Sequence, residues 1–204
     1  MPEYRPLPEA YEREFDETWS YAFSPESGLP EDDPEDVPPS ARPGATRGLF
    51  EDEELLAICR HYWFTCRVGD DWLPVGGVAS VATLPEHRRQ GHVRRTLSAT
   101  LSEYRDREIL LAALWAFDQA FYAQFGWALA NQYARLRVPP EELSFAREER
   151  EAKAAGASEG SFVRLDADDY ERLVPVLSAH GVDHNLAMDR TEEWWRTRGF
   201  GDRG

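Results

Sequence analysis

The chain has 204 residues, of which 42% are hydrophobic, and its 38 acidic and 23 basic residues give a formal net charge of −15. This length suits one domain of ordinary size plus part of another, and seven tryptophans can supply a real core. So acidic a chain disfavours nucleic acid as a partner. The acid excess and the single lysine, Lys153, favour a salt-rich cytoplasm.

The N-terminal quarter predicts a short strand over 4–7 and a helix over 9–23, where three aromatic residues recur at intervals of four. Residues 24–46 hold six prolines and six acids, so we expect a mobile acidic loop there. Two roles stay open for this loop: plain disorder, or a lid over a substrate cleft. No signal-peptide core precedes these elements, which favours a cytoplasmic location.

Residues 49–68 alternate in a way that predicts one or two strands, and the turn signal at 68–72 closes a hairpin. Cys59 and Cys66 lie seven apart in this stretch and point to opposite faces, so we expect two reduced thiols. Their spacing does not fit a zinc site either. One side of the alternation carries Leu56, Ile58, Tyr62, Phe64 and Val68.

The centre of the chain predicts a parallel strand pair joined by a helix. An apolar strand over 75–84 ends at Pro85, a helix spans 93–106, and a second buried strand covers 108–117. The longest apolar run, 109–117, is too short to cross a bilayer, and we expect no membrane contact. The ligand crevice of such a unit lies beyond the carboxyl ends of its strands.

The rest of the chain predicts a short helix over 119–125, a strand over 127–138 and a charged helical linker. Residues 163–172 then repeat weakly the pattern of 4–13, as a short strand entering a helix. Chance remains an alternative for this repeat. We expect an N-terminal domain over 1–140, a linker over 141–160, and the beginning of a second, incomplete domain over 161–204.

The basic segment 87–95 contains four arginines, two histidines and no acid. It connects a strand to a helix N-terminus, where free N–H groups and the helix dipole attract anions. The segment lacks the Gly-Lys-Ser/Thr of a P-loop and the three glycines of a dinucleotide fingerprint. We therefore predict a phosphate-binding loop, with a surface turn of solvated arginines as the alternative.

Two motifs resemble those of the GNAT superfamily of N-acetyltransferases. The segment Arg88-Arg89-Gln90-Gly91-His92-Val93 is similar to its acetyl-CoA pyrophosphate loop, Arg/Gln-x-x-Gly-x-Gly/Ala, with a departure at Val93. The stretch 77–91 and the later Phe121-Tyr122-Ala123-Gln124-Phe125-Gly126-Trp127 resemble the enhanced-intracellular-survival-type branch, which tolerates a non-glycine at the Val93 position. The resemblance is close over about residues 49–140 and looser elsewhere.

The resemblance implies an α/β GNAT fold, with a central mixed sheet whose parallel strands splay between flanking helices, and acetyl-CoA as cosubstrate without a metal. It implies direct attack of a primary amine on the thioester, with Tyr122 as general acid; the alternative for Tyr122 is one more packed aromatic residue. The acceptor would be a small polyamine, an aminoglycoside-like molecule or a protein lysine. The implied cofactor contacts are Val81, Ala82 and Thr83 on the pantetheine arm, Arg88, Arg89, Gln90, Gly91, His92, Val93 and Arg94 on the pyrophosphate, and Phe117 and Asp118 beside the thioester.

Three further expectations concern what the chain lacks or exposes. In the resembled family more domains follow and the chain's terminal carboxylate is the catalytic base, so we expect a truncated form without an evident base; Asp118 and His61 match no family motif. His180, Asp183 and His184 could suggest a metal site, but Gly181 lies between the two histidines and no third ligand pattern follows, so we expect no metal there. Exposed Trp194, Trp195 and Phe200 would promote self-association. Two rivals stay open: a non-catalytic acyl-CoA-binding or scaffold module, and a nucleotide-phosphate binder.

Overall fold

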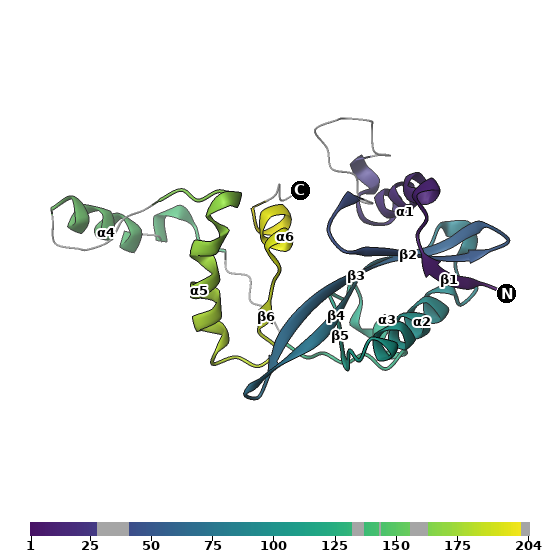
Figure 1. Ribbon diagram of the computed structural model, residues 1–204. Coiled ribbons are helices and arrows are strands. Elements are labelled where there is room, and N and C mark those ends of the chain that lie inside the picture. Colours follow the sequence, from purple (N-terminus) through teal and green to yellow (C-terminus); the bar gives the residue numbers. More distant parts are fainter. Residues whose placement is uncertain (28–40, 132–136, 143, 156–162, 201–204) are drawn as a thin grey trace.

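A mixed six-stranded sheet forms the centre of the chain in the computed structural model (Figure 1), which describes residues 1–27, 41–131, 137–142, 144–155 and 163–200. Strands β4 and β5 are parallel, and the other described pairs are antiparallel. The strands are, in sheet order, β1 (Glu3–Pro6), β2 (Ala45–Glu51), β3 (Glu54–Val68), β4 (Asp71–Ala82) and β5 (Leu111–Leu114), with β6 (Met188–Asp189) paired to β3.

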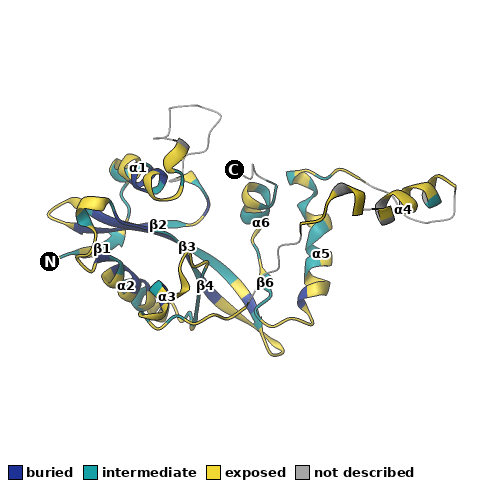
Figure 2. Cartoon of the chain, turned by 180° about the vertical axis from the view of Figure 1, so that it is seen from behind, coloured by how far each residue is buried: buried dark blue, intermediate teal, exposed yellow. Residues whose placement is uncertain are grey.

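Helices cover both faces of this sheet. The first is α1 (Glu12–Phe23), which packs Phe15 against Ile58 and Ala82; the opposite face holds α2 (His92–Asp106), whose Leu97 joins a cluster with Val78. The buried positions gather between these layers, whereas α4 (Ser144–Ala154) and most of α5 (Tyr170–Gly181) are exposed (Figure 2). The remaining helices are α3 (Gln119–Ala123) and α6 (Glu192–Trp194), which continues as a π-helix over Trp195–Gly199.

The stretch predicted as one or two strands forms two, because the chain reverses at Asp52 and Glu53, both with positive φ. The β3–β4 hairpin closes through the predicted turn at Gly69. Tyr62 and Phe64 stack at 5.7 Å on one face, in agreement with the alternation. Both cysteines are buried and free.

Three predicted strands differ from the structure. The segment 108–117 pairs only over β5, and Trp115 and Phe117 lie exposed beyond it. The described parts of 127–138, which are 127–131 and 137–138, form no strand, since none of these residues pairs with β5. Residues 163–166 are not a strand either, because Asp166 instead caps the helical turn that leads into α5. The central part of the predicted loop 24–46 lies outside the described residues, and its last two residues belong to β2.

The C-terminal segment joins the sheet along β3, beyond His61, which is the residue that pairs with the first residue of β2. β6 pairs with Thr65 and Cys66, and Trp194 meets Tyr62 and Phe64 around a cavity of about 90 Å³. The expectation that Trp194, Trp195 and Phe200 are exposed was wrong, because all three are half-buried. Among the described helices, none is both long and apolar enough to cross a bilayer.

Candidate functional site

The parallel strands β4 and β5 part at one end of the sheet. They pair from Val75–Leu111 to Val78–Leu114, and β4 then runs on to Ala82 with β3 as its described strand partner. A bulge bends β4 here, since its residues 79–82 oppose only residues 58–60 of β3. Ser80 lies in the bulge with a φ of 53°. Backbone groups of β4 are therefore left facing the opening between the two strands.

The predicted basic loop lies directly beyond β4 and leads into α2. Arg89 and Gly91 have positive φ values of 61° and 81°, and Gly91 begins the helix without a side-chain cap. In the described structure, the backbone N–H groups of residues 89–94 have no intramolecular partner. A Cβ at Gly91 would meet nothing within 4 Å, so the approach to these groups is open. The loop can bind an anion.

Several side chains of the loop are held by the protein itself. Arg88 donates to the Thr83 carbonyl at 3.0 Å and lies over the Tyr21 ring at 5.5 Å. Arg94 lies over the Phe125 ring at 5.1 Å. The predicted contacts of 88–94 thus lie together in one loop, and the guanidinium groups of Arg88 and Arg94 lie against other parts of the protein.

His92 is the buried titratable side chain of the loop. It is 5% exposed, and neither ring nitrogen has a hydrogen-bond partner in the described residues. Its ring centroid lies 6.5 Å from that of His87, whose Nε2 is 3.4 Å from Glu54 Oε1. Burial, followed by the charge of Arg95, lowers the pKa of His92.

Tyr122 lies in α3, where it is 5% exposed. It belongs to the hydrophobic cluster that contains Val78, and Leu114 packs against the same cluster. Val78 and Leu114 are the last pair of residues that join β4 and β5 before the two strands part. Its ring centroid is 5.7 Å from Phe117, and its hydroxyl makes no hydrogen bond to any described residue. Burial raises the pKa of the phenol, so it stays protonated at neutral pH.

Neither candidate base is free to act. Asp118 accepts from the N–H groups of Ala120 and Phe121 at 2.8 and 3.3 Å, which makes it the N-cap of α3. His61 is 0% exposed and lies beneath α2, packed on Tyr104. Asp118 and His61 are the two residues that the sequence analysis considered as the catalytic base.

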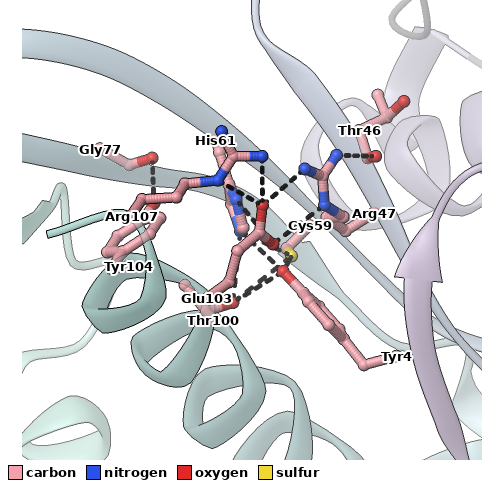
Figure 3. A network of polar contacts seen from close by, with 10 residues as sticks. All are labelled: Tyr4, Thr46, Arg47, Cys59, His61, Gly77, Thr100, Glu103, Tyr104 and Arg107. Atoms are coloured by element: carbon pink, nitrogen blue, oxygen red, sulfur yellow. Dashed lines mark hydrogen bonds and ion pairs between the residues drawn. The ribbon is translucent and has the colours of Figure 1, made fainter. Parts of the chain in front are cut away.

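A buried polar network, which the sequence analysis did not predict, fills the space between β1, β2, β3 and the C-terminal half of α2 (Figure 3). Glu103 accepts from Arg47 at 2.7 and 3.1 Å and from Arg107 at 3.1 Å. His61 Nε2 lies 2.8 Å from the Tyr4 hydroxyl, while its Nδ1 is 3.7 Å from Glu103. A cavity of about 690 Å³ opens beside Glu103. The sequence signal was the polar pair Arg60-His61, which interrupts the apolar residues 55–59 and 62–64 of one strand.

Opposing influences act on the pKa values of this network. Burial lowers the pKa of His61 to about 4, although Glu103 acts in the other direction. Hydrogen bonds and charge from Arg47 lower the pKa of Glu103 in spite of burial. His61 is therefore neutral and Glu103 ionised at neutral pH.

The histidines of the α5 end make a local contact. His184 Nδ1 lies 2.8 Å from the His180 carbonyl, and the two rings stack at 4.2 Å. Within the described ranges, no three His, Cys, Asp or Glu side chains gather in a way that could hold a metal.

The acetyltransferase (GNAT) domain family matches residues 3–130, which is more than half of the chain, so the chain belongs to this family. An uncharacterized N-acetyltransferase of Streptomyces griseus is 27% identical over 157 residues, or 75% of this chain and 36% of that protein. N-acetyltransferase Eis of Mycobacterium tuberculosis is 34% identical over 97 residues, or 48% of this chain and 23% of Eis.

The fold agrees with this family. Eis1 from Mycobacterium abscessus superimposes with a TM-score of 0.64 at 20% identity, covering 98% of this chain and 47% of Eis1. The predicted GNAT fold is thereby confirmed, and the similarity to Eis proteins agrees with the predicted branch. The chain spans about a third of the length of the Streptomyces relative, 36%.

Proposed function

We propose that this chain is the acetyl-CoA-binding part of an N-acetyltransferase, which transfers the acetyl group to a primary amine by direct attack. The observation that carries the proposal is the opening between β4 and β5, with the unpartnered N–H groups of residues 89–94 directly beyond it. An extended arm and a diphosphate need those two features side by side. Membership of the GNAT family supports the same chemistry.

The residues at the opening fit such a cosubstrate. The backbone of Val81, Ala82 and Thr83 would pair with the pantetheine arm as a neighbouring strand does, since β5 has already diverged. The N–H groups of residues 89–94 would hold the diphosphate, helped by the positive end of α2. Phe117, which is 74% exposed, would border the thioester with Asp118.

Tyr122 would supply the proton for the departing thiolate. A neutral phenol can protonate a thiolate whose conjugate acid has a pKa of about 8.5. Its hydroxyl has no competing partner among the described residues, and it lies in the cluster at the point where the strands part. An unpaired, protonated hydroxyl beside the reacting sulfur is what a general acid requires.

The acceptor in this proposal is a small polyamine, an aminoglycoside-like amine or a protein lysine. The net charge of −15 favours a cationic molecule through long-range attraction. The amine must lose a proton before it attacks, and neither Asp118 nor His61 is placed to take it. The source of this base is therefore part of what the experiment must locate.

The test combines binding and turnover on the same chain. Isothermal titration with acetyl-CoA, CoA and ATP should give binding of the first two and none of the third, because ATP lacks the pantetheine arm that β4 would pair with. Thiol release is then measured with polyamines, aminoglycosides and lysine peptides from pH 6 to 9. Equal binding of ATP would contradict the cofactor assignment, and binding without any release would indicate a non-catalytic acyl-CoA module.

A further inference from the structure

His92 carries an ionisable imidazole at a buried position where packing does not require one. It is the first residue of α2, directly after Gly91, and its imidazole is buried with both nitrogens lacking partners in the described residues. Burying polar atoms without hydrogen bonds costs free energy. An apolar side chain would fill the same space without that cost. Packing alone therefore does not account for an imidazole here.

Charged and titratable groups surround His92 from three elements. His87 approaches from the turn Pro85–His87, and Glu51 from the end of β2. Arg95 lies one turn further along α2. His87 itself has Glu54 at 3.4 Å. The positive groups and the N-terminal end of the helix dipole oppose a charge on His92, and Glu51 only partly offsets them.

We propose that His92 is a positioning residue of the phosphate loop, which takes up a proton from solvent when a diphosphate settles on the N–H groups of residues 89–94. This inference rests on the proposed function, because the diphosphate is that of the CoA cosubstrate. The ring forms no bond to the ligand and changes only its protonation state. A protonated ring then adds one positive charge directly beneath the bound anion.

The physical reason is the change in field at the helix end. Without a ligand, the dipole and Arg95 disfavour a second positive charge beside them. A bound diphosphate reverses the sign of the local field and favours the charged imidazole. The pKa of His92 is then higher in the complex than in the free protein, so binding and protonation assist each other. Affinity for CoA must therefore rise as the pH falls toward the lower of the two pKa values.

The test is isothermal titration of CoA at pH 6, 7 and 8 in two buffers of different ionisation enthalpy, which counts the protons taken up. Wild-type protein is compared with His92→Leu and with His87→Gln, the matched neighbouring histidine. The phosphates of CoA titrate in every sample, so their protons cancel in the differences. A one-unit shift of one group permits at most about tenfold in affinity, and we expect about three- to tenfold between pH 8 and pH 6.

We expect wild type and His87→Gln to take up some tenths of a proton more on binding CoA than His92→Leu does. We also expect the affinity of His92→Leu for CoA to lack the increase at low pH that wild type shows. His92→Leu should unfold at the same temperature as wild type or higher, because it buries no unpaired nitrogens. If it does not fold, His92→Gln, which cannot titrate, replaces it in the same comparison. Equal uptake in wild type and the His92 variant overturns the inference, as does loss of uptake in His87→Gln alone. Failure of wild type to bind CoA at any pH overturns the proposed function instead.

Discussion

The polar groups around the two halves of α2 differ in whether they have hydrogen-bond partners within the described structure. Beneath its C-terminal half, Glu103 accepts hydrogen bonds from Arg47 and Arg107, and His61 lies against Tyr4. Around its N-terminal half, the N–H groups of residues 89–94 and the Tyr122 hydroxyl have no partner in the described structure. Polar groups that are satisfied internally hold a fold together, whereas unsatisfied ones remain for a ligand. The comparison therefore supports the proposal that one half of the helix stabilises the fold and the other half binds the cosubstrate.

The largest effect should come from Gly91→Asp. Its φ of 81° would cost an aspartate about 1 kcal/mol, and a carboxylate about 4 Å from a phosphate adds about 4 kcal/mol of repulsion. We expect CoA affinity to fall at least about a thousandfold by titration calorimetry. Gly69→Asp is the matched control, because Gly69 also has a positive φ and open space but lies in the β3–β4 turn. Similar losses in both variants would contradict the binding role of the loop.

The next effect concerns Tyr122→Phe, which keeps the ring and removes the proton. The turnover number should fall by about 10²–10⁴, the usual range for a general acid, with little change in CoA affinity. Tyr104→Phe removes the other hydroxyl of the same cluster, which donates to the Gly77 carbonyl at 3.0 Å. That control should lose stability rather than turnover. A loss below about threefold for Tyr122→Phe, with chemistry rate-limiting, would count against the acid role.

The network beneath the other half of α2 should respond in stability. Glu103→Ala leaves Arg47, whose side chain is 9% exposed, without its bidentate partner. We expect unfolding by urea to require about 2–3 kcal/mol less, below the full cost of a broken buried pair because Glu103 is 19% exposed. Glu17→Ala, which breaks the surface pair with Arg13, should cost at most about 0.5 kcal/mol. Equal costs would remove the contrast between the two kinds of ion pair.

The last expectation is a pH dependence of the folding stability. The pKa of His61 is lowered to about 4 by burial, while an unfolded histidine has a pKa of about 6.5. Between these values the unfolded chain binds a proton that the folded chain excludes, so stability falls as the pH drops through this window. The shift corresponds to at most about 3 kcal/mol. Urea unfolding from pH 7 to pH 4 should show a steeper decline for wild type than for His61→Gln, and parallel curves would show that His61 does not titrate as inferred.

Local patterns in the sequence indicated the basic loop that leads into the N-terminal half of α2, and they missed the polar network beneath its C-terminal half. Gly91 and the arginines of segment 87–95 are close together in the sequence. The strands before and after this segment carry apolar runs, which indicate a parallel pair. Arg47, His61 and Glu103 come from three separate elements, and no spacing rule connects them. Their contact depends on the register between β2 and β3 and on the position of α2 against the sheet. Both are determined by tertiary packing.

Two of the wrong strand predictions, those over 108–117 and 127–138, share one cause. A strand exists only where a neighbour accepts its hydrogen bonds, and the described parts of 127–138 have none. The side-chain pattern of a segment cannot reveal a missing neighbour. The same limit explains β6, whose two residues pair with Thr65 and Cys66 without a strand-like pattern of their own.

The placement of β1 at the edge of the sheet has a consequence for the order of folding. The β3–β4 hairpin closes through a two-residue turn, whereas β1 can pair with β2 only after residues 7–44 have been looped back. Closing long loops is slow relative to closing short ones. The hairpin and the β4–α2–β5 unit should therefore acquire protected amides first. Tyr4, which β1 carries to His61, would then complete the buried network only at the last stage of folding, as a reporter of the finished domain.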